Sequence, residues 1–301
     1  MESGRKTNQF VPREPCKWTE FMHLRKTGRE RNVPYFDKLQ TAKLVQKSGF
    51  RTAKILHVFD GPCSLDFSSF PDAFVLKPAA FSGRKGVMLL HRCDDTNKYW
   101  EAMENRWLTL DMIRLEQFKW QELWYKHRKK PFQFIVEEMI VGENGSDKIP
   151  FDYKLFTFDG DVRLIIQVDR NIKPRALAWF LGDFQPFEAR TRIETNWTTI
   201  TQGKHQIPKC HKEIINMARK ISMELATPFV SVDTYTTAAG PVIGELELST
   251  GGPYRGYAFS FKPQFDKELG SAWAQANHRL GRETPLLDTD PDLKPPPIYS
   301  K

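Results

Sequence analysis

The sequence lacks several features that define specialised classes of protein. It has no run of roughly 18 apolar residues, the length that a membrane-spanning helix needs. Its first six residues, Met-Glu-Ser-Gly-Arg-Lys, lack the apolar segment of a signal peptide. We therefore expect a cytoplasmic protein with no membrane partner.

Cysteine is scarce, and two common catalytic motifs are missing. The four cysteines form no Cys-x-x-Cys pair, so we expect reduced thiols rather than a zinc site or a disulfide framework. The sequence has no Gly-Lys-Ser/Thr of a Walker loop and no Gly-x-Ser-x-Gly elbow. It also shows no internal repeat, and no Cys/His arrangement that indicates a covalent nucleophile.

The composition is that of an ordinary folded protein with a basic charge balance. The chain has 301 residues, 40% of them hydrophobic and 27% charged, enough for one large domain or two smaller ones that share a cleft. Its formal net charge of +8 suggests an anionic ligand such as a nucleotide, a nucleic acid or an acidic metabolite. The basic clusters at 126–130 and 163–175 match no nucleic-acid motif, so we do not expect nucleic acid as a partner.

Hydrophobic periodicity and turn residues predict an alternation of helices and strands. We expect helices over 37–49, 96–129 and 208–226, and strands over 74–78, 86–91, 132–140, 153–158, 162–168, 230–235 and 240–248. Asp159-Gly160 predicts a tight hairpin turn between two of these strands. The order predicts an α+β protein with at least two sheets, followed by a proline-rich tail.

The last predicted hairpin concentrates negative charge in an apolar context. Glu245 and Glu247 share one face of their strand, whereas Leu246 and Leu248 point to the other face and into a core. Asp233 stands alone among apolar neighbours on the partner strand. Three carboxylates on one hairpin predict a Mg²⁺ site, because like charges on a half-buried face need a cation. For Glu-x-Glu alone, a solvated strand face is the commoner arrangement.

A glycine-rich segment follows the first predicted strand. Lys77 ends this strand, where a buried ammonium is costly unless it meets an anion. Residues 81–87 contain two glycines, whose backbone can approach phosphate oxygens, and Arg84 and Lys85 add positive charge. The segment is a candidate phosphate loop, and a plain polar hairpin is the alternative.

The order of these motifs resembles that of the ATP-grasp superfamily, most closely its TupA-like (teichuronopeptide biosynthesis) branch. The resemblance runs from about residue 15 to residue 270 and is carried by residues 74–78, 152–160 and 244–252. It implies two α+β lobes that grip ATP between antiparallel sheets. The regions expected are a 1–36 N-terminal extension, a 37–131 lobe with the phosphate loop, a 132–284 lobe with the Mg²⁺ site, and a 285–301 tail.

The resemblance also implies roles for individual residues, with ATP and Mg²⁺ as cofactors. The implied nucleotide contacts are Lys38 and Lys77 at the phosphates, Ser82, Gly83, Arg84, Lys85 and Gly86 in the loop above them, Glu137, Glu138, Met139 and Ile140 in the adenine hinge, Glu143 at the ribose, and Lys154 from the other sheet. The implied metal ligands are Asp233, Glu245 and Glu247.

Two positions depart from the family pattern. Many relatives have Asn where Glu247 stands, and relatives often have Arg where Ser231 stands. That arginine stabilises the transferring phosphoryl group in the family. Its role here would fall to another cation, the candidates being Arg84, Lys85, Arg163 and Arg255.

The function implied is that of an ATP-dependent carboxylate–amine ligase that forms an amide or peptide bond through an acyl phosphate and releases ADP and phosphate. Lys154, Arg163 and Arg255 are the catalytic candidates, and Arg255 is expected to recognise the acid. An ATP-grasp kinase acting on a hydroxyl of a small molecule or sugar would share every ATP residue. A non-catalytic basic binding protein is a second alternative, against which the three carboxylates argue. The sequence predicts neither the two substrates nor the oligomeric state.

Overall fold

In the computed structural model the chain forms two compact units, and residues 13–34, 37–81, 83–93, 98–127, 132–143, 145 and 148–287 are described. Unit 1 comprises Met1–Pro34, Phe151–Thr234 and Glu247–Lys301, and unit 2 comprises Tyr35–Pro150 and Tyr235–Leu246. Both units combine helices with largely antiparallel strands, which confirms the predicted α+β class.

The units are discontinuous in sequence, whereas the predicted lobes are contiguous. Unit 2 continues past residue 131 to Pro150 and takes in Tyr235–Leu246. Trp18 lies within the predicted N-terminal extension, yet its side chain is fully buried in the core of unit 1. Leu287 exchanges backbone hydrogen bonds with Arg13 at 2.7 and 3.1 Å, and the rest of the predicted tail lies outside the described residues.

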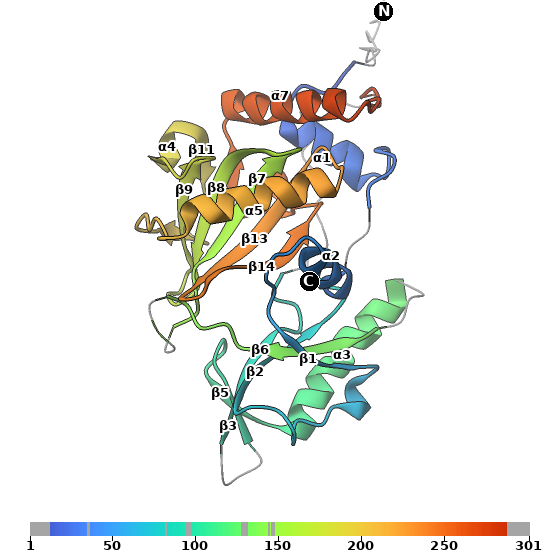
Figure 1. Ribbon diagram of the computed structural model, residues 1–301, viewed down its shortest axis with the longest axis vertical. Coiled ribbons are helices and arrows are strands. Elements are labelled where there is room, and N and C mark those ends of the chain that lie inside the picture. Colours follow the sequence, from blue (N-terminus) through green and yellow to red (C-terminus); the bar gives the residue numbers. More distant parts are fainter. Residues whose placement is uncertain are drawn as a thin grey trace, which may run out of the picture. The chain divides into compact units, whose positions relative to one another are not determined.

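Unit 2 is built on a sheet whose described strands are all antiparallel and follow the order β1-β6-β2-β3-β4-β5. Its helices and strands, most of them labelled in Figure 1, are α2 (Lys38–Lys47), β1 (Ile55–Phe59), the 3₁₀ turn η1 (Pro62–Ser64), β2 (Ala73–Pro78), β3 (Met88–Cys93), β4 (Lys98–Glu101), β5 (Arg106–Thr109), α3 (Leu110–His127) and β6 (Phe134–Glu138). Phe74, Leu76 and Phe134 form a hydrophobic cluster with Ile113 and Trp124 of α3.

Local sequence explains where α2 begins. Asp37 is its N-cap: the Asp37 carboxylate accepts a hydrogen bond from the Gln40 backbone N–H at 2.8 Å, and the Gln40 side chain accepts one from the Asp37 N–H at 3.2 Å. This reciprocal capping box satisfies two N–H groups that would otherwise lack partners. The cap fixes Lys38 as the first residue of the helix.

The prediction of one helix over 96–129 is wrong in its first third. Residues 98–109 form the hairpin β4–β5, and the helix begins only at Leu110. Trp100 and Trp107 face each other across this hairpin with ring centroids 5.2 Å apart. Asn105 takes the left-handed conformation in the turn (φ 53°), so a cross-strand aromatic pair and an asparagine turn override the helical propensity of the surrounding residues.

Unit 1 contains most of the second large sheet, whose order is β10-β9-β8-β7-β13-β14 with β12 beside β9. Its elements are α1 (Trp18–Lys26), β7 (Asp152–Phe158), β8 (Asp161–Asp169), β9 (Ala176–Leu181), β10 (Pro186–Phe187), α4 (Ala189–Arg192), β11 (Ile193–Thr195), β12 (Thr201–Gln202), α5 (His211–Glu224), α6 (Gly252–Arg255), β15 (Phe259–Phe261) and α7 (Pro263–Arg279). The sheet also includes β13 (Val230–Thr237) and β14 (Gly240–Glu247).

Aromatic packing holds the helices of unit 1 on its sheet. Trp18 of α1 and Trp273 of α7 join Phe156 of β7 and Phe229 in one cluster, in which Phe229 stacks on Trp273 with centroids 4.9 Å apart. Alternate sheet residues such as Leu155 are also fully buried, so both faces of the sheet are covered. Figure 1 shows α5 lying across the strands.

The tight turn predicted at Asp159-Gly160 is confirmed. It joins β7 to β8, and both residues have positive φ angles, 46° and 84°. Two successive left-handed residues match the right-handed twist of the flanking strands. Glycine adopts such an angle without the steric penalty of a Cβ atom, which explains why this dipeptide predicts the turn.

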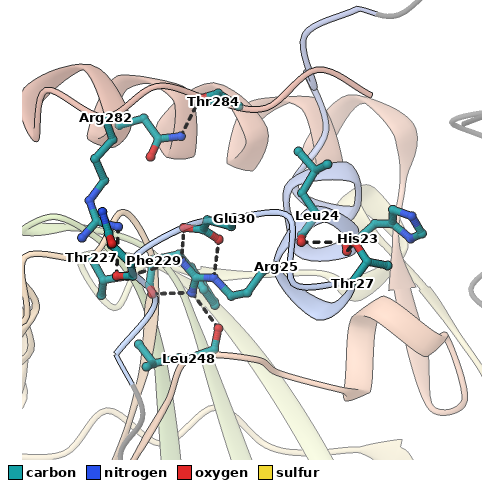
Figure 2. Close-up of polar contacts among 12 residues, drawn as sticks. His23, Leu24, Arg25, Thr27, Glu30, Thr227, Phe229, Leu248, Arg282 and Thr284 are labelled. Atoms are coloured by element: carbon teal, nitrogen blue, oxygen red, sulfur yellow. Dashed lines mark hydrogen bonds and ion pairs between the residues drawn. The ribbon is translucent and has the colours of Figure 1, made fainter. Parts of the chain in front are cut away.

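A buried arginine anchors α1 in unit 1 (Figure 2). The Arg25 guanidinium pairs with both Glu30 oxygens at 2.6 and 2.8 Å and donates to the backbone oxygens of Phe229 and Leu248 at 2.9 and 2.7 Å. It also lies over the Trp273 ring, 4.5 Å from the centroid. A buried charge is tolerated here because every face of it meets an acceptor or a π-system.

Several smaller expectations can be compared with the structure. Leu246 and Leu248 are buried, as predicted, and Glu245 and Glu247 are partly exposed. All four cysteines are free, and Cys16 and Cys63 are exposed. Among the described residues, no helix combines the length and the apolar character needed to cross a membrane.

Candidate functional site

Two lysines of unit 2 lie close to carboxylates. Lys38 is only 9% exposed, and its ammonium lies 3.6 Å from Glu245 and donates to the Phe81 carbonyl oxygen. Lys77 pairs with Glu137 at 2.5 Å. Glu137 is opposite Val75, two residues before Lys77, so this ion pair joins diagonal neighbours on one face of the sheet.

These four side chains form the unit 2 cluster: Lys38, Lys77, Glu137 and Glu245. Burial lowers the pKa of Lys38 because it penalises the charged form, Glu245 opposes that effect, and Lys77 lowers the pKa further by repulsion. An additional anion placed beside this ammonium would stabilise its charged form. The cluster can therefore hold a phosphate group.

The glycine-rich loop between β2 and β3 is a compact turn with two left-handed glycines. Gly83 and Gly86 have φ angles of 70° and 71°. A Cβ atom at Gly86 would lie 2.7 Å from the Pro78 ring, and the Gly86 carbonyl oxygen accepts a hydrogen bond from the buried Gln117 side chain at 3.0 Å. The loop is thus held at Gly86 and open around Gly83, where an added Cβ would meet no atom within 4 Å.

The charged side chains of this loop lie at the surface. Arg84 pairs with Glu104 at 2.5 Å, and both side chains are half exposed. The Lys85 ammonium lies 5.7 Å from the centroid of the Phe81 ring. Ser82 lies outside the described residues. Two cations near an open glycine turn can attract phosphate oxygens, and their phosphate role stays a prediction.

The segment predicted as the adenine hinge follows the end of β6. Glu137 is buried in the lysine pair described above, whereas the exposed Glu138 accepts a hydrogen bond from the Lys54 backbone N–H at 2.9 Å. Met139 and Ile140 come after the strand and are partly exposed. Glu143 is also partly exposed. Backbone groups beyond a strand end have no ladder partners, as a hinge requires.

Unit 1 carries a second group of charges on one face of its sheet. Lys154 and Asp152 are two residues apart on β7, and Asp233 lies on the neighbouring β13. The Lys154 ammonium pairs with Asp233 and lies 3.4 Å from Asp152. Arg170 pairs with Asp152 at 2.8 Å. We call these four residues the unit 1 cluster.

The protonation state of Lys154 follows from its surroundings. Burial favours the neutral amine, but three carboxylates, those of Asp152, Asp233 and Glu247, outweigh that effect and hold the pKa of Lys154 well above its usual range. Lys154 is therefore a fixed positive charge. It is suited to bind phosphate oxygens and unsuited to act as a base.

The three predicted metal ligands are divided between the units. Asp233 and Glu247 belong to unit 1 and share the field of one cation, Lys154, whereas Glu245 belongs to unit 2 and faces Lys38. Carboxylate oxygens are the donors that Mg²⁺ prefers, and in each unit an ammonium stands beside them. Among the described residues, no three His, Cys, Asp or Glu side chains are arranged to hold a metal, and the triad stays a prediction.

The position that often holds arginine in relatives is filled by a small buried donor. Ser231 donates a hydrogen bond to Asp233 at 2.9 Å. Of the candidate replacements, Arg163 is half exposed and pairs with Asp161 at 2.6 Å. The Nε atom of Arg255 is buried and has no hydrogen-bond partner among the described residues. Arg170, which was not among the candidates, is the arginine that belongs to the unit 1 cluster.

A comparison with known families decides where the chain belongs. The family model described as TupA-like ATP-grasp matches residues 21–274. The chain belongs to the TupA-like ATP-grasp family. This confirms both the predicted resemblance and the predicted fold class. A search of curated proteins found no match.

Solved structures similar to this TupA-like protein are distant in sequence. D-alanine–D-alanine ligase from Bacillus anthracis is 15% identical with a TM-score of 0.46, covering 81% of this chain and 67% of that one. An L-amino acid ligase from Bacillus licheniformis is 15% identical with a TM-score of 0.46, and the match covers 77% of this chain and 48% of that one. The ATP-grasp ligase PsnB, complexed with its minimal precursor, is 13% identical with a TM-score of 0.43, and the match covers 80% of this chain and 60% of that one. The TupA-like chain thus spans less than two thirds of the PsnB chain.

Sequence reasoning missed Arg170, which belongs to the unit 1 cluster, and Lys26, on which Glu247 acts. Arg170 comes directly after β8, whereas Lys154 lies on the neighbouring strand β7, and no local sequence motif marks Arg170. Lys26, on the N-terminal helix, is affected electrostatically by Glu247. The Asp-Tyr-Lys motif already contained a signal for Asp152, because residues two apart in a strand share a face.

Proposed function

We propose that this protein is an ATP-dependent carboxylate–amine ligase that forms an amide or peptide bond and releases ADP and phosphate. The observation that carries the proposal is that each unit holds a lysine–carboxylate cluster. These residues are among those that the family resemblance predicts to bind ATP and Mg²⁺. The cytoplasm is the proposed location, and small-molecule carboxylates and amines are the proposed substrates.

The first step would join the acid to the terminal phosphate of ATP. A carboxylate oxygen attacks the γ-phosphorus, the bond from that phosphorus to the β–γ bridging oxygen breaks, and ADP leaves as an acyl phosphate forms. Charge on the phosphoryl oxygens must be neutralised, which three lysines support: Lys38, Lys77 and Lys154. Bound Mg²⁺ would add Lewis-acid neutralisation, with Asp233, Glu245 and Glu247 as its ligands.

The second step would make the new bond. The amine nitrogen attacks the acyl carbon, the carbon–oxygen bond to phosphate breaks, and the leaving phosphate takes the proton that the nitrogen loses. Neither step needs a covalent enzyme nucleophile, so positioning and charge neutralisation are the work of the protein. The high pKa of Lys154 suits this role, since a permanent cation stabilises phosphoryl oxygens without exchanging protons.

The variant Glu245→Gln tests the proposal. It removes one negative charge from the predicted metal site and from beside Lys38, so turnover should fall by ~100-fold or more. Glu122→Gln makes the same change on an exposed part of α3 and should leave turnover unaltered. ADP release is measured over a panel of acids and amines, with thermal unfolding as a check on folding.

One result would contradict the role of Glu245, and another would contradict the ligase reaction. Retained activity of Glu245→Gln at saturating Mg²⁺ would remove this residue from the site. A stable phosphorylated product formed without any amine would favour the kinase.

A further inference from the structure

A group of basic side chains lies where the chain leaves β14 in unit 1. The Lys26 ammonium, at the end of α1, donates a hydrogen bond to the Ser249 carbonyl oxygen at 2.9 Å and lies 5.6 Å from the centroid of the Tyr254 ring. Arg255 follows Tyr254 in the sequence and is the last residue of α6. Two segments more than 200 residues apart thus place a lysine and an arginine close enough to repel each other electrostatically.

Among the described residues, neither Lys26 nor Arg255 forms an ion pair with a carboxylate, although Glu247 acts on Lys26 electrostatically. The buried Nε of Arg255 lacks a hydrogen-bond partner, and Lys26 is hydrogen bonded only to a carbonyl oxygen. Burial lowers the pKa of Lys26, Glu247 partly restores it, and Arg255 lowers it again by repulsion. Two cations that repel each other at a partly buried position are stabilised by a bound anion.

The surrounding contacts hold the pair in place. The Tyr254 hydroxyl contacts His23 Nδ1 at 3.0 Å, which ties α6 to α1. Arg25 binds the Leu248 carbonyl oxygen in Figure 2, and its neighbour Lys26 binds that of the next residue, Ser249. Consecutive residues of α1 therefore hold consecutive carbonyl groups beyond β14. Such preorganisation reduces the entropic cost of binding a ligand.

The pair also lies near Glu247, one of the predicted metal ligands. Glu247 raises the pKa of Lys26 and that of Lys154, so its carboxylate is near enough to both ammonium groups to stabilise their charge. A ligand on the pair would thus be next to the acidic end of β14. A reacting carboxylate held by two cations would be a poor nucleophile, so the pair is better suited to a group that does not react.

We propose that Lys26 and Arg255 bind a second, non-reacting carboxylate of the acid substrate, so that the substrate is a dicarboxylate. Arg255 offers a planar fork for two parallel hydrogen bonds, and Lys26 adds a point charge. This proposal rests on the proposed ligase function, and it goes further by assigning the class of acid. It also gives the N-terminal helix a part in substrate selection.

Calorimetric titration of the full chain tests the proposal. Succinate, glutarate and adipate are each compared with their monoamides, with and without Mg²⁺ and a non-hydrolysable ATP analogue. At least one dicarboxylate should bind ~10-fold more tightly than its monoamide. Lys26→Met and Arg255→Gln should each abolish that difference, whereas Lys26→Arg should largely keep it. Lys267→Met, an exposed site on α7, is the matched control and should behave as the unaltered protein.

Several outcomes would overturn the proposal. They are equal binding of each acid and its monoamide, dicarboxylate binding that survives both Lys26→Met and Arg255→Gln, and equal losses of affinity for the ATP analogue and for the acid. ADP release with acid and amine separates the two proposals. If monocarboxylates support release and dicarboxylates do not bind, the ligase function stands and the dicarboxylate site falls. If dicarboxylates bind through Lys26 but no acid supports release, the site stands and the ligase function falls.

Discussion

Lys38 shows how a single residue is prepared for a ligand. It is the first residue of a capped helix, its pKa is lowered by burial, and its ammonium lies between the Glu245 carboxylate and the Phe81 carbonyl oxygen. Burying a lysine is costly, and the protein recovers only part of that cost through one carboxylate 3.6 Å away. An additional anion would recover more, as expected of a phosphate-binding lysine.

This leads to a matched comparison on one helix. Lys38→Met should weaken ATP binding ~10-fold or more, because a buried charge–phosphate contact is lost. Lys47→Met removes an exposed lysine at the other end of α2 and should leave the affinity unaltered. Titration with ATP and Mg²⁺ gives both dissociation constants. Equal affinities for the two variants would exclude Lys38 from the nucleotide site.

Glu20 gives a pH-dependent prediction on stability. It is buried near the start of α1, and although burial raises its pKa, hydrogen bonds from Arg13 and from the backbone N–H groups of Cys16 and Lys17 outweigh this and lower the pKa below 4.5. A carboxyl group with a lowered pKa stabilises the fold above its unfolded pKa, and this contribution is lost as the pH falls through the folded pKa.

We therefore expect Glu20→Gln to lower the free energy of unfolding by about 2 kcal/mol at about pH 7, because three donors lose a charged acceptor. The difference from the unaltered protein should shrink as the pH falls below about 4.5 and be lost as the pH passes through the lowered pKa of the folded state. Denaturant titrations at a series of pH values measure it. A difference that stays constant across this range would show that the charge of Glu20 is not responsible.

At the scale of elements, the β2–β3 loop offers a second matched pair. Gly86→Ala forces a Cβ atom to within 2.7 Å of Pro78 at a left-handed φ, whereas Gly83→Ala has the same backbone angle and open space. Gly83→Ala should cost about 1 kcal/mol of stability from backbone strain alone. Gly86→Ala should cost roughly 2–4 kcal/mol, since a steric clash adds to that strain. Thermal or chemical unfolding compares them, and equal losses would show that Pro78 and Gln117 do not fix the loop.

The elements also show which patterns in a sequence suffice for prediction. The turn at Asp159-Gly160, the helix that Asp37 caps, and the strands around Lys77 follow from local rules, and all are confirmed. The hairpin at 98–109 was predicted as helix because its polar and aromatic residues carry a weak strand signal. Its structure depends on Trp100 meeting Trp107 and on the Asn105 turn, which propensity averaged over a long window does not detect.

Some residues of the candidate site can likewise be predicted from local sequence patterns, and others cannot. Residues in motifs, such as Lys77 and the carboxylates of β14, are visible in the sequence because spacing of two places them on one face. Arg170 and Lys26 are not visible, because their contacts with Asp152 and Ser249 join segments that only the folded chain brings together. The diagonal pairing of Lys77 with Glu137 likewise depends on strand register.

For the whole molecule, the two units are discontinuous in sequence, and the contiguous lobes stay a prediction. Residues 235–246 belong to unit 2, although the residues on either side belong to unit 1. Ile243 forms a parallel bridge with Thr52, and its N–H donates to the Arg51 carbonyl oxygen at 2.9 Å, so this part of β14 packs with the start of unit 2. Consequently the predicted metal ligands come from both units, which a local motif does not reveal.

The ligase function of the whole molecule is tested most directly by trapping the acyl phosphate. The protein is incubated with ATP, Mg²⁺ and the acid that supports turnover, and hydroxylamine replaces the amine. An acyl-phosphate route predicts a hydroxamate of that acid, formed in proportion to ADP and lost in Glu245→Gln. Release of AMP and pyrophosphate, or ADP formation with a phosphorylated acceptor and no hydroxamate, would contradict it.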